Sequence, residues 1–470
     1  SASTTIPAIS IEGTSAGANI GMILEWENVG QNLIQSTATT GGGIQITGTG
    51  AAASASSGIR ANAATLYILS TVGDIVITGN AGTDAINDLQ LNSTTIIGGF
   101  TGSATVNGIP VSTATSRANI SLLTHGGFEP GGAITITTGS STVPGGDVLV
   151  AANVDNVDGG HIYTKGTFTV NSNGGDITFG GGDINGSGFA LGSQQNRSLG
   201  FRSDNNFTLN SAGGDIVMRC KGAARNDVPN GWDACGISAS GGLFNLNSGT
   251  GIINLQGFSQ QTNTGTSEAF GIIFRGSGAR ITSANTTSNA ITIIGNASAA
   301  KSSYAEGIIF ASSGTFEATA TASGGGITVS SLSGSNDPEV MYCADPVYIL
   351  AVDGDISVTA SGAGATGFYA APGSPLVLGS TAATNTTNDI TSSTSDITFN
   401  VENKGVSWSL GTGNEPEINT TGSFSLLSTA YSMYKNWYTF GSTLSSLTFG
   451  NPAGNTGTMY IDEALTVGGP

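Results

Sequence analysis

One short phrase recurs along the chain and constrains its fold more than any other feature. It is a glycine followed by an apolar residue, and after residue 200 its copies are separated by about 35 residues. A fixed period of this length is typical of architectures in which each repeat stacks on the next. The copies are Gly21-Met22, Gly58-Ile59, Gly200-Phe201, Gly236-Ile237, Gly271-Ile272, Gly307-Ile308 and a weakened Met341-Tyr342, with more distant relatives near Ile109, Ile162, Phe368, Val406 and Tyr438.

A second phrase follows most copies of the first and alternates apolar with polar residues. Gly73-Asp74-Ile75-Val76-Ile77 and Gly175-Asp176-Ile177-Thr178-Phe179 are two examples. A third apolar run, such as Leu243-Phe244-Asn245-Leu246, lies between the two phrases. Alternation with period two predicts short strands that have one buried face. Each repeat therefore contains three short strands separated by Gly, Ser or Asn turns.

Three strands in each repeat of about 35 residues predict one coil of a parallel β-helix. The chain has 73 glycines, and we expect many of them at coil corners, where positive φ angles are needed. So much glycine also excludes long helices. We predict an all-β, single-stranded, right-handed parallel β-helix of about a dozen three-strand coils, continuous over residues 1–470, with surface loop insertions near 79–103, 221–234 and 331–339.

Charge narrows the range of partners. Asp and Glu number 31 against 13 Lys and Arg, which gives a net charge of −18. Such a surface repels phosphate backbones and anionic lipid surfaces, and there is no apolar run of about 20 residues that could cross a bilayer. We therefore expect neither nucleic-acid binding nor membrane insertion. The opening Ser1–Thr5 lacks the features of a signal peptide, so we expect no export signal in this chain.

Candidate catalytic residues are sparse. Six aspartates precede the same inward strand residue, which favours a structural corner position over acid–base catalysis, because paired catalytic carboxylates need different environments. His125 and His161 are predicted on the surface, with no metal-ligand spacing around them. We expect no enzyme activity, no cofactor and no metal. The six aspartates are Asp74, Asp147, Asp176, Asp215, Asp355 and Asp396.

Two other groups of residues are candidates for a structural or contact role. Cys220 and Cys235 bracket the second predicted loop, and a disulfide between them would fix the base of that loop. Cys343 is expected to be a buried thiol. The densest aromatic cluster consists of Tyr431, Tyr434, Trp437 and Tyr438. Exposed aromatic faces of this kind can contact sugars, although packing against the coils is the simpler use.

The recurrent Gly-Asp-Ile-x-Ile phrase and the tail from Leu447 to Pro470 resemble the filamentous haemagglutinin-like adhesins, which are bacterial surface proteins exported by two-partner or autotransporter-type routes. The resemblance implies a right-handed β-helix at the cell surface or outside the cell. We expect a non-catalytic structural or adhesive rod that presents loops, binding itself or a cell-surface or glycan receptor. The chain would be a segment of a longer protein or a fibre subunit. The alternatives are a β-helical polysaccharide lyase or hydrolase, a phage tailspike, and a self-assembling sheath or filament subunit.

Overall fold

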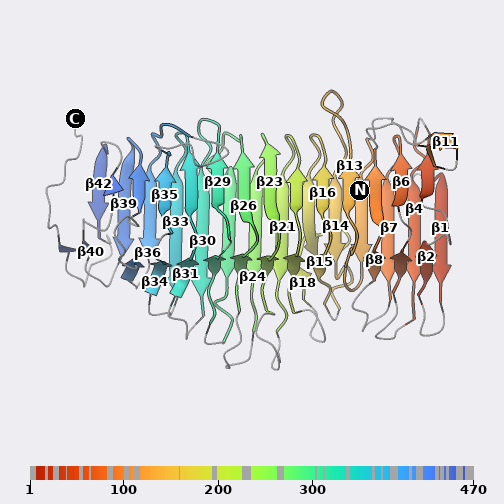
Figure 1. The fold of residues 1–470 in the computed structure, drawn as a ribbon, viewed down its shortest axis with the longest axis horizontal. Coiled ribbons are helices and arrows are strands. Elements are labelled where there is room, and N and C mark those ends of the chain that lie inside the picture. Colours follow the sequence, from red (N-terminus) through yellow and green to blue (C-terminus); the bar gives the residue numbers. More distant parts are fainter. Residues whose placement is uncertain are drawn as a thin grey trace. The chain divides into compact units, whose positions relative to one another are not determined.

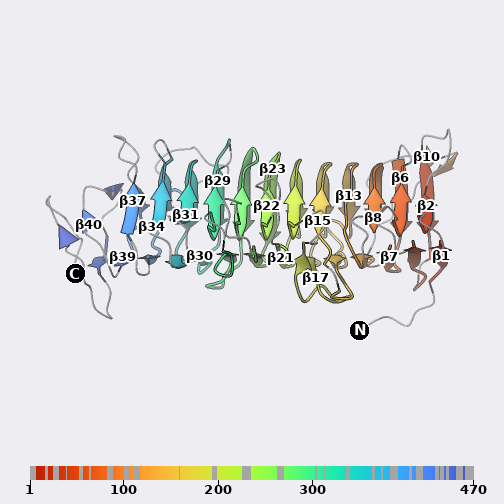
Figure 2. The same cartoon turned by 90° about the horizontal axis from the view of Figure 1, so that it is seen from below.

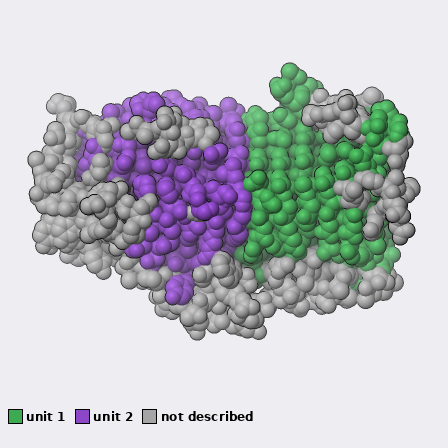
Figure 3. Space-filling view, in the orientation of Figure 1, with its two compact units in different colours: residues 1–223 green, residues 224–470 purple. Residues whose placement is uncertain are grey.

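The computed structural model contains two compact units, residues 1–223 and residues 224–470 (Figure 3). In the residues that the structure describes, every regular element is a β-strand. These residues are 7–15, 20–24, 31–38, 40–51, 57–62, 65–81, 88–99, 105–106, 108–110, 117–157, 159–192, 198–224, 234–261, 269–301, 304–311, 313–334, 339–362, 366–371, 374–381, 390–401, 405–408, 416–428, 433–434, 439–440, 444–450 and 459–460.

Unit 1 is built from three parallel sheets. The first sheet contains β1 (Ile9–Thr14), β4 (Ile44–Thr49), β7 (Ile75–Asn80), β12 (Ile120–Thr124), β14 (Val148–Ala152), β17 (Ile177–Gly181) and β21 (Ile216–Lys221), with β18 (Ala190–Leu191) beside β21. The second contains β3 (Asn32–Ser36), β6 (Thr65–Ser70), β9 (Thr94–Gly98), β13 (Ile134–Thr137), β16 (Phe168–Asn171) and β20 (Phe207–Asn210). The third is formed by β2 (Met22–Leu24), β5 (Ile59–Ala61) and β8 (Leu89–Leu91), followed by β15 (Ile162–Thr164) and β19 (Phe201–Ser203), and single bridges from Phe128 to Leu89 and Ile162 join the two sets.

Unit 2 repeats the same arrangement. Its first sheet contains β24 (Ile253–Phe258), β27 (Ile291–Asn296), β30 (Ile327–Ser333), β33 (Ile356–Gly362), β36 (Ile397–Val401), β39 (Ser423–Ser428) and β42 (Ser446–Phe449). The second contains β23 (Leu243–Gly249), β26 (Gly278–Ser283), β29 (Phe316–Ala320), β32 (Val347–Ala351), β35 (Leu376–Gly379), β38 (Glu417–Asn419) and β41 (Thr439–Phe440). The third contains β22 (Ile237–Ala239), β25 (Ile272–Phe274), β28 (Ile308–Phe310), β31 (Glu339–Cys343), β34 (Thr366–Ala370) and β37 (Gly405–Trp408).

Successive coils stack in register within each unit. A coil passes through the third, second and first sheets in turn, and its strands pair with the equivalent strands of the next coil (Figures 1 and 2). One coil of unit 1 contributes only the bridging residue Phe128 to the third sheet, between β8 and β15. The apolar residue of the recurring Gly phrase stacks on its own copies, as Met22 on Ile59 in unit 1 and Ile272 on Ile308 in unit 2. This arrangement is a parallel β-helix, which confirms the predicted fold class.

Alternate side chains of the strands fill the interior. In β7 and β27 the residues facing inward are buried, while those between them are partly exposed. Phenylalanines stack along each core: the Phe168 and Phe207 ring centroids lie 5.6 Å apart in unit 1, and those of Phe274 and Phe310 lie 5.8 Å apart in unit 2. Burial of these large apolar surfaces stabilises the coils, because the strands themselves are short.

Buried hydroxyl groups satisfy the backbone at the corner between the second and first sheets. Ser70 Oγ donates to the Gly73 carbonyl, and Ser248 Oγ donates to the Gly251 carbonyl, at 2.5 and 2.6 Å. Ser172 makes the equivalent bond to Gly175. A carbonyl buried in a turn is costly unless it is hydrogen-bonded, which explains why small hydroxyl residues recur at this corner.

Glycine is needed at the entry to the third sheet because coils approach closely there. A Cβ on Gly271 would lie 2.2 Å from the Asn296 nitrogen, and a Cβ on Gly58 would lie 2.2 Å from the Asn80 nitrogen. Both contacts are with main-chain atoms of a neighbouring strand, which cannot move away without breaking the ladder. The recurring glycine of the sequence therefore marks a steric requirement.

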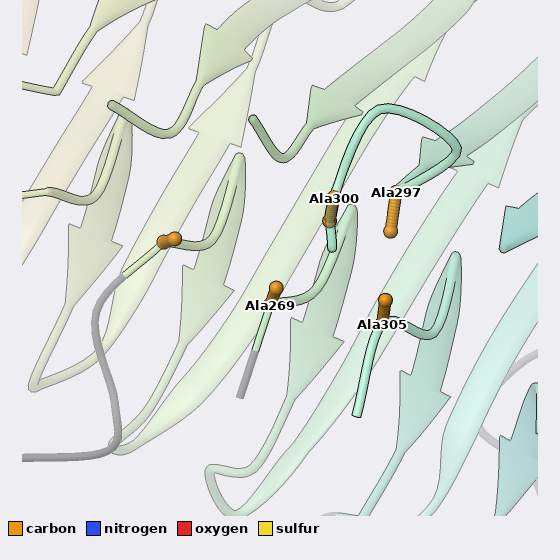
Figure 4. Close-up of a cluster of buried hydrophobic side chains, with 5 residues drawn as sticks. Ala269, Ala297, Ala300 and Ala305 are labelled. Atoms are coloured by element: carbon orange, nitrogen blue, oxygen red, sulfur yellow. The ribbon is translucent and has the colours of Figure 1, made fainter. Parts of the chain in front are cut away.

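Alanine side chains also allow neighbouring segments of the chain to approach closely, at a turn in unit 2. Ala269 and Ala305 lie just before the third-sheet strands, and Ala297 and Ala300 lie in the turn after β27 (Figure 4). These side chains are almost fully buried together with Ala234.

In the described part of the chain, no helix has the length and apolar character that a bilayer span requires.

Two details of the sequence-based prediction are wrong. Residues 88–99 of the predicted 79–103 loop belong to the coils, because β8 and β9 lie there and pair with β5 and β6; residues 82–87 and 100–103 lie outside the described residues. The distant copy of the Gly phrase near Ile109 does not start a coil: β10 (Thr105–Val106) and β11 (Ile109–Pro110) form an antiparallel hairpin in which Ile109 is 58% exposed.

The other predicted insertions are seen only in part. Residues 225–233 of the 221–234 segment lie outside the described residues, as do residues 335–338 of the 331–339 segment. Strand β30 continues to Ser333 and β31 begins at Glu339, so the connection between these two strands is shorter than the predicted 331–339 insertion.

Candidate functional site

The recurring aspartates occupy one repeated corner, as predicted. In unit 1, the inward residues that follow them stack in register, as Ile75 on Ile120, Val148 on Ile177 and Ile177 on Ile216. Each acidic or amide side chain therefore lies beside its copy in the next coil. We call the series Asp74, Asn119, Asp147, Asp176 and Asp215 the corner ladder.

Four side chains of the corner ladder, from Asp74 to Asp176, each accept a hydrogen bond from the backbone of the next coil. Asp74 Oδ1 accepts a hydrogen bond from the Asn119 amide at 3.1 Å, and Asn119 Oδ1 accepts one from the Asp147 amide at 2.9 Å. The pattern continues from Asp147 to Asp176 and from Asp176 to Asp215, at 2.9 and 2.8 Å. A carboxylate that accepts an amide N–H is held more strongly than a neutral acceptor, which offsets the repulsion between stacked like charges.

The same corner recurs in unit 2. Ile356 stacks on Ile397, so Asp355 and Asp396 occupy the corner there. Asp396 Oδ1 accepts hydrogen bonds from the Ser423 amide and hydroxyl at 2.8 and 2.7 Å. The hydrogen bonds from Ser423 hold the pKa of Asp396 below its ordinary value. The corner carboxylates thus serve as coil-to-coil bonds in both units.

A second ionic cluster lies on the third sheet of unit 1, and sequence reasoning missed it. Glu129 Oε1 lies 2.8 Å from His161 Nε2, and Glu129 Oε2 lies 2.7 Å from Lys165 Nζ. His161 is 1% exposed and Glu129 is 2% exposed. The prediction that His161 lies on the surface is therefore wrong. We call Glu129, His161 and Lys165 the Glu129 cluster.

Charges continue onto the next coil beside the Glu129 cluster. Lys165 Nζ lies 5.0 Å from the centroid of the Tyr163 ring, and Arg202 Cζ lies 5.3 Å from it. Asp204 accepts from the Tyr163 hydroxyl and pairs with Arg202 Nε at 2.5 Å. Both cations are thus paired with carboxylates as well as with the aromatic ring, so this face does not present an excess of positive charge.

A buried carboxyl group stands at the entry to β8. Asp88 is 0% exposed and accepts hydrogen bonds from the Ala81 amide at 3.1 Å and from the Gly126 amide. Burial raises the pKa of Asp88 to about 7, although these amide bonds lower it, and the negative charge of Asp155 raises it further. Asp155 itself pairs with His125, which is about one-third exposed, at 3.1 Å.

These ionic groups are arranged for internal bonding. A carboxylate that binds one imidazole nitrogen orients the ring, an arrangement that acid–base catalysis also uses. The imidazole of His161, however, is almost fully enclosed, and a substrate must reach the group that exchanges its proton. Among the described residues, no three His, Cys, Asp or Glu side chains are grouped so that they could hold a metal ion.

An accessible groove of about 640 Å³ lies on the outer face of the first sheet of unit 1. Its floor is made by outward side chains of β4, β7, β12 and β14, among them Val76, Ser121, Leu123 and Leu149. Its size falls within the range of ligand pockets. Other lining residues are Pro7, Gly41, Gly42, Gly43, Ile44, Gln45, Val72, Gly73, Asp74, Asn119, Ile184 and Asn185.

One wall of the groove is a preorganised loop between Gly182 and Gly188. Asp183 Oδ1 accepts hydrogen bonds from the Asn185 and Ser187 amides at 2.8 and 3.0 Å, and Asp183 Oδ2 accepts from the Ser187 hydroxyl. Hydrogen bonds from Ser187 lower the pKa of Asp183, so its charged form holds the loop. Gly186 has a φ of 63°, and a Cβ on it would lie 2.7 Å from Leu149 Cδ1. The loop therefore packs directly onto the groove floor.

The three cysteines singled out from the sequence lie in the interior of the coils. Cys220, Cys235 and Cys343 are all buried, and Cys220 and Cys343 carry free thiols whose pKa values burial raises. A disulfide between Cys220 and Cys235 is not formed in this structure and stays a prediction for the oxidised protein.

The predicted aromatic cluster lies mostly beyond the residues that can be described. Tyr431, Trp437 and Tyr438 lie outside the described residues. Tyr434 ends the short strand β40 (Met433–Tyr434), which pairs with β43 (Met459–Tyr460). Contact of these aromatic residues with sugars stays a prediction.

Comparison of the chain with protein-family models, with curated proteins and with solved structures yields no match in any of the three. The parallel β-helix is therefore established by the structure alone. Membership of the haemagglutinin-like adhesins stays a prediction.

Proposed function

We propose that this chain is a non-catalytic structural and adhesive protein of the cell surface or extracellular space, similar to the filamentous haemagglutinin-like adhesins. Its stacked coils would hold loops and grooves for attachment to a cell-surface or glycan receptor, or to further copies of itself. A parallel β-helix suits this role because its coils bind one another through main-chain ladders over any length.

The corner ladder is the observation that carries the proposal. Its acidic side chains are the carboxylates that a polysaccharide-cleaving β-helix would need in an accessible row. Here Asp74, Asp147 and Asp176 each accept a hydrogen bond from a backbone amide of the next coil. The buried Glu129 and His161 likewise bond each other, and Glu129 also pairs with the partly exposed Lys165. Both sets of ionisable groups therefore support a structural use over catalysis.

Retention and turnover assays on the full chain test the proposal. The protein is added to immobilised polysaccharides and to intact cells, and the bound fraction and any released oligosaccharide are measured over time. We expect stable retention on at least one surface with no released product. Release of product that Glu129→Gln or Asp176→Asn abolishes would favour an enzyme. Absence of retention on every surface tested would overturn the adhesive part of the proposal.

A further inference from the structure

The groove on unit 1 departs from the surface pattern of the same sheet in unit 2. In unit 2, the outward residue at the second position of β24, β27, β30, β33 and β36 is polar. In unit 1, Val76, Leu149 and Val217 occupy this position in β7, β14 and β21, and the first two line the groove. Leu123 of β12 adds an outward apolar side chain two residues further along its strand, where β27 of unit 2 carries Ile294. The polar residues of unit 2 are Asn254, Thr292, Thr328, Ser357 and Thr398.

Ile184 places an apolar side chain beside the groove, and most of that side chain is not packed against the coils. It is 60% exposed, although the loop that carries it is held by the Asp183 hydrogen bonds. Burial of an isoleucine side chain stabilises a protein, whereas exposure does not. A rigid loop that holds an exposed Ile184 at the edge of an apolar floor is the arrangement expected of a ligand-contact wall.

Polar groups surround this apolar floor. The corner ladder uses Oδ1 of Asp74 and Oδ1 of Asn119. Asp74 Oδ2 and the Asn119 amide group therefore remain able to bond a ligand, and Gln45, Ser121 and Asn185 line the same groove. Planar carboxylate and carboxamide groups can each make paired hydrogen bonds, which suits the neighbouring hydroxyl groups of a sugar ring.

From this geometry we infer that the groove binds a short, uncharged oligosaccharide, whose C–H faces would pack on Val76, Leu149 and Ile184 while its hydroxyl groups bond the surrounding polar side chains. The inference rests on the proposed adhesive function and names its ligand class.

Charge and backbone pairing decide between the possible ligands. Asp74 is the charged residue in the groove lining, and the whole chain carries a net charge of −18. Anionic glycans are therefore repelled. The groove floor is the face of a sheet whose strands are already paired on both sides, as β7 is with β4 and β12. It offers no free strand edge for an extended peptide.

Binding by the full chain to a panel of uncharged oligosaccharides, anionic oligosaccharides and peptides tests this inference. Ser121→Arg places a bulky charge on the groove floor, and Ile184→Ser removes the apolar wall without touching the Asp183 hydrogen bonds. The matched control is Thr292→Arg, which changes the same outward position in β27 of unit 2. Circular dichroism spectra compare the folding of the variants.

We expect the wild-type chain and Thr292→Arg to bind the same uncharged oligosaccharide with equal affinity. Ser121→Arg and Ile184→Ser should each weaken this binding at least tenfold, and anionic analogues should bind at least tenfold more weakly. Preference for an anionic glycan or a peptide, or unchanged affinity in folded Ser121→Arg, would overturn the groove assignment. If Ser121→Arg still adheres to cells, only the groove assignment fails. If the wild-type chain adheres to nothing, the proposed function fails.

Discussion

The buried carboxyl group of Asp88 predicts a specific pH dependence of stability in unit 1. Burial raises its pKa from 3.8 to about 7 in the folded protein. The folded state therefore keeps the proton between about pH 4 and pH 7, whereas the unfolded chain releases it. The stabilisation is fully present below about pH 4 and is lost as the pH rises through 7.

The size of this effect follows from the shift. Each pKa unit corresponds to about 1.36 kcal/mol of differential interaction between the protonation states. A rise from 3.8 to about 7 therefore corresponds to about 4 kcal/mol lost between pH 4 and pH 8. This loss is comparable to removal of a large buried side chain.

Urea unfolding of the full chain, followed by circular dichroism at half-unit steps from pH 4 to pH 8, measures this dependence. The same series is recorded for Asp88→Asn, which cannot titrate. The variant loses one of the acceptors for the Ala81 and Gly126 amides, so its stability is expected to be lower at pH 4. The informative quantity is the slope of the free energy of unfolding against pH. This slope should be steeper for the wild-type chain than for Asp88→Asn, by up to about 1.4 kcal/mol per pH unit.

Asp183→Asn is the matched control. Hydrogen bonds from Ser187 lower the pKa of Asp183 below its ordinary value of 3.8, so this carboxyl is ionised in both the folded and the unfolded state above about pH 5, and its removal should leave the wild-type slope from pH 5 to pH 8 unchanged. Equal slopes for the wild-type chain and Asp88→Asn would refute the assignment of this pH dependence to Asp88.

Three further changes have definite expected outcomes. Phe274→Ala removes a stacked core ring, so the free energy of unfolding measured in urea should fall by about 3–5 kcal/mol; a loss below 1 kcal/mol would contradict the packing. Gly271→Ala forces a Cβ against the Asn296 amide and should destabilise the chain by more than about 1 kcal/mol, whereas an unchanged urea midpoint would argue against close approach. Cys220 should resist a thiol reagent in the native, unreduced protein because it is buried; reaction of both Cys220 and Cys235 there would exclude their disulfide.

The coil architecture was predictable because its causes are local. Each coil needs a glycine where a neighbouring backbone approaches, and a strand with alternating apolar residues. Both features lie within a few residues of each other in the sequence, so they can be recognised there. The coil that begins at Leu89 was missed because Asp88 stands where other coils have glycine. The bonds that make Asp88 suitable there come partly from Gly126, which lies in the next coil and could not be recognised from the sequence around residue 88.

Neither candidate site could be assembled from the sequence because its residues come from different coils. His161 lies in a glycine-rich turn and was expected on the surface, but its burial depends on Glu129 and other distant residues. The groove was missed for a similar reason. A signal was present: Val76 and Leu149 occupy strand positions that are polar in unit 2. It becomes visible only when the coils are aligned in register.

Replacement of Asp176 tests most directly whether the corner carboxylates are structural bonds. Asp176 Oδ1 accepts the Asp215 amide, so Asp176→Ala should lower the free energy of unfolding by about 1 kcal/mol, as loss of a side-chain cap does in helices. Asp176→Asn should retain wild-type stability, because Asn119 makes the same bond with a carboxamide. Stability in urea and release of oligosaccharides from retained glycans are measured on all three proteins. The account predicts a stability loss in the alanine variant alone and no product from any of them; unchanged stability together with a glycan-cleaving activity that both variants lose would contradict it.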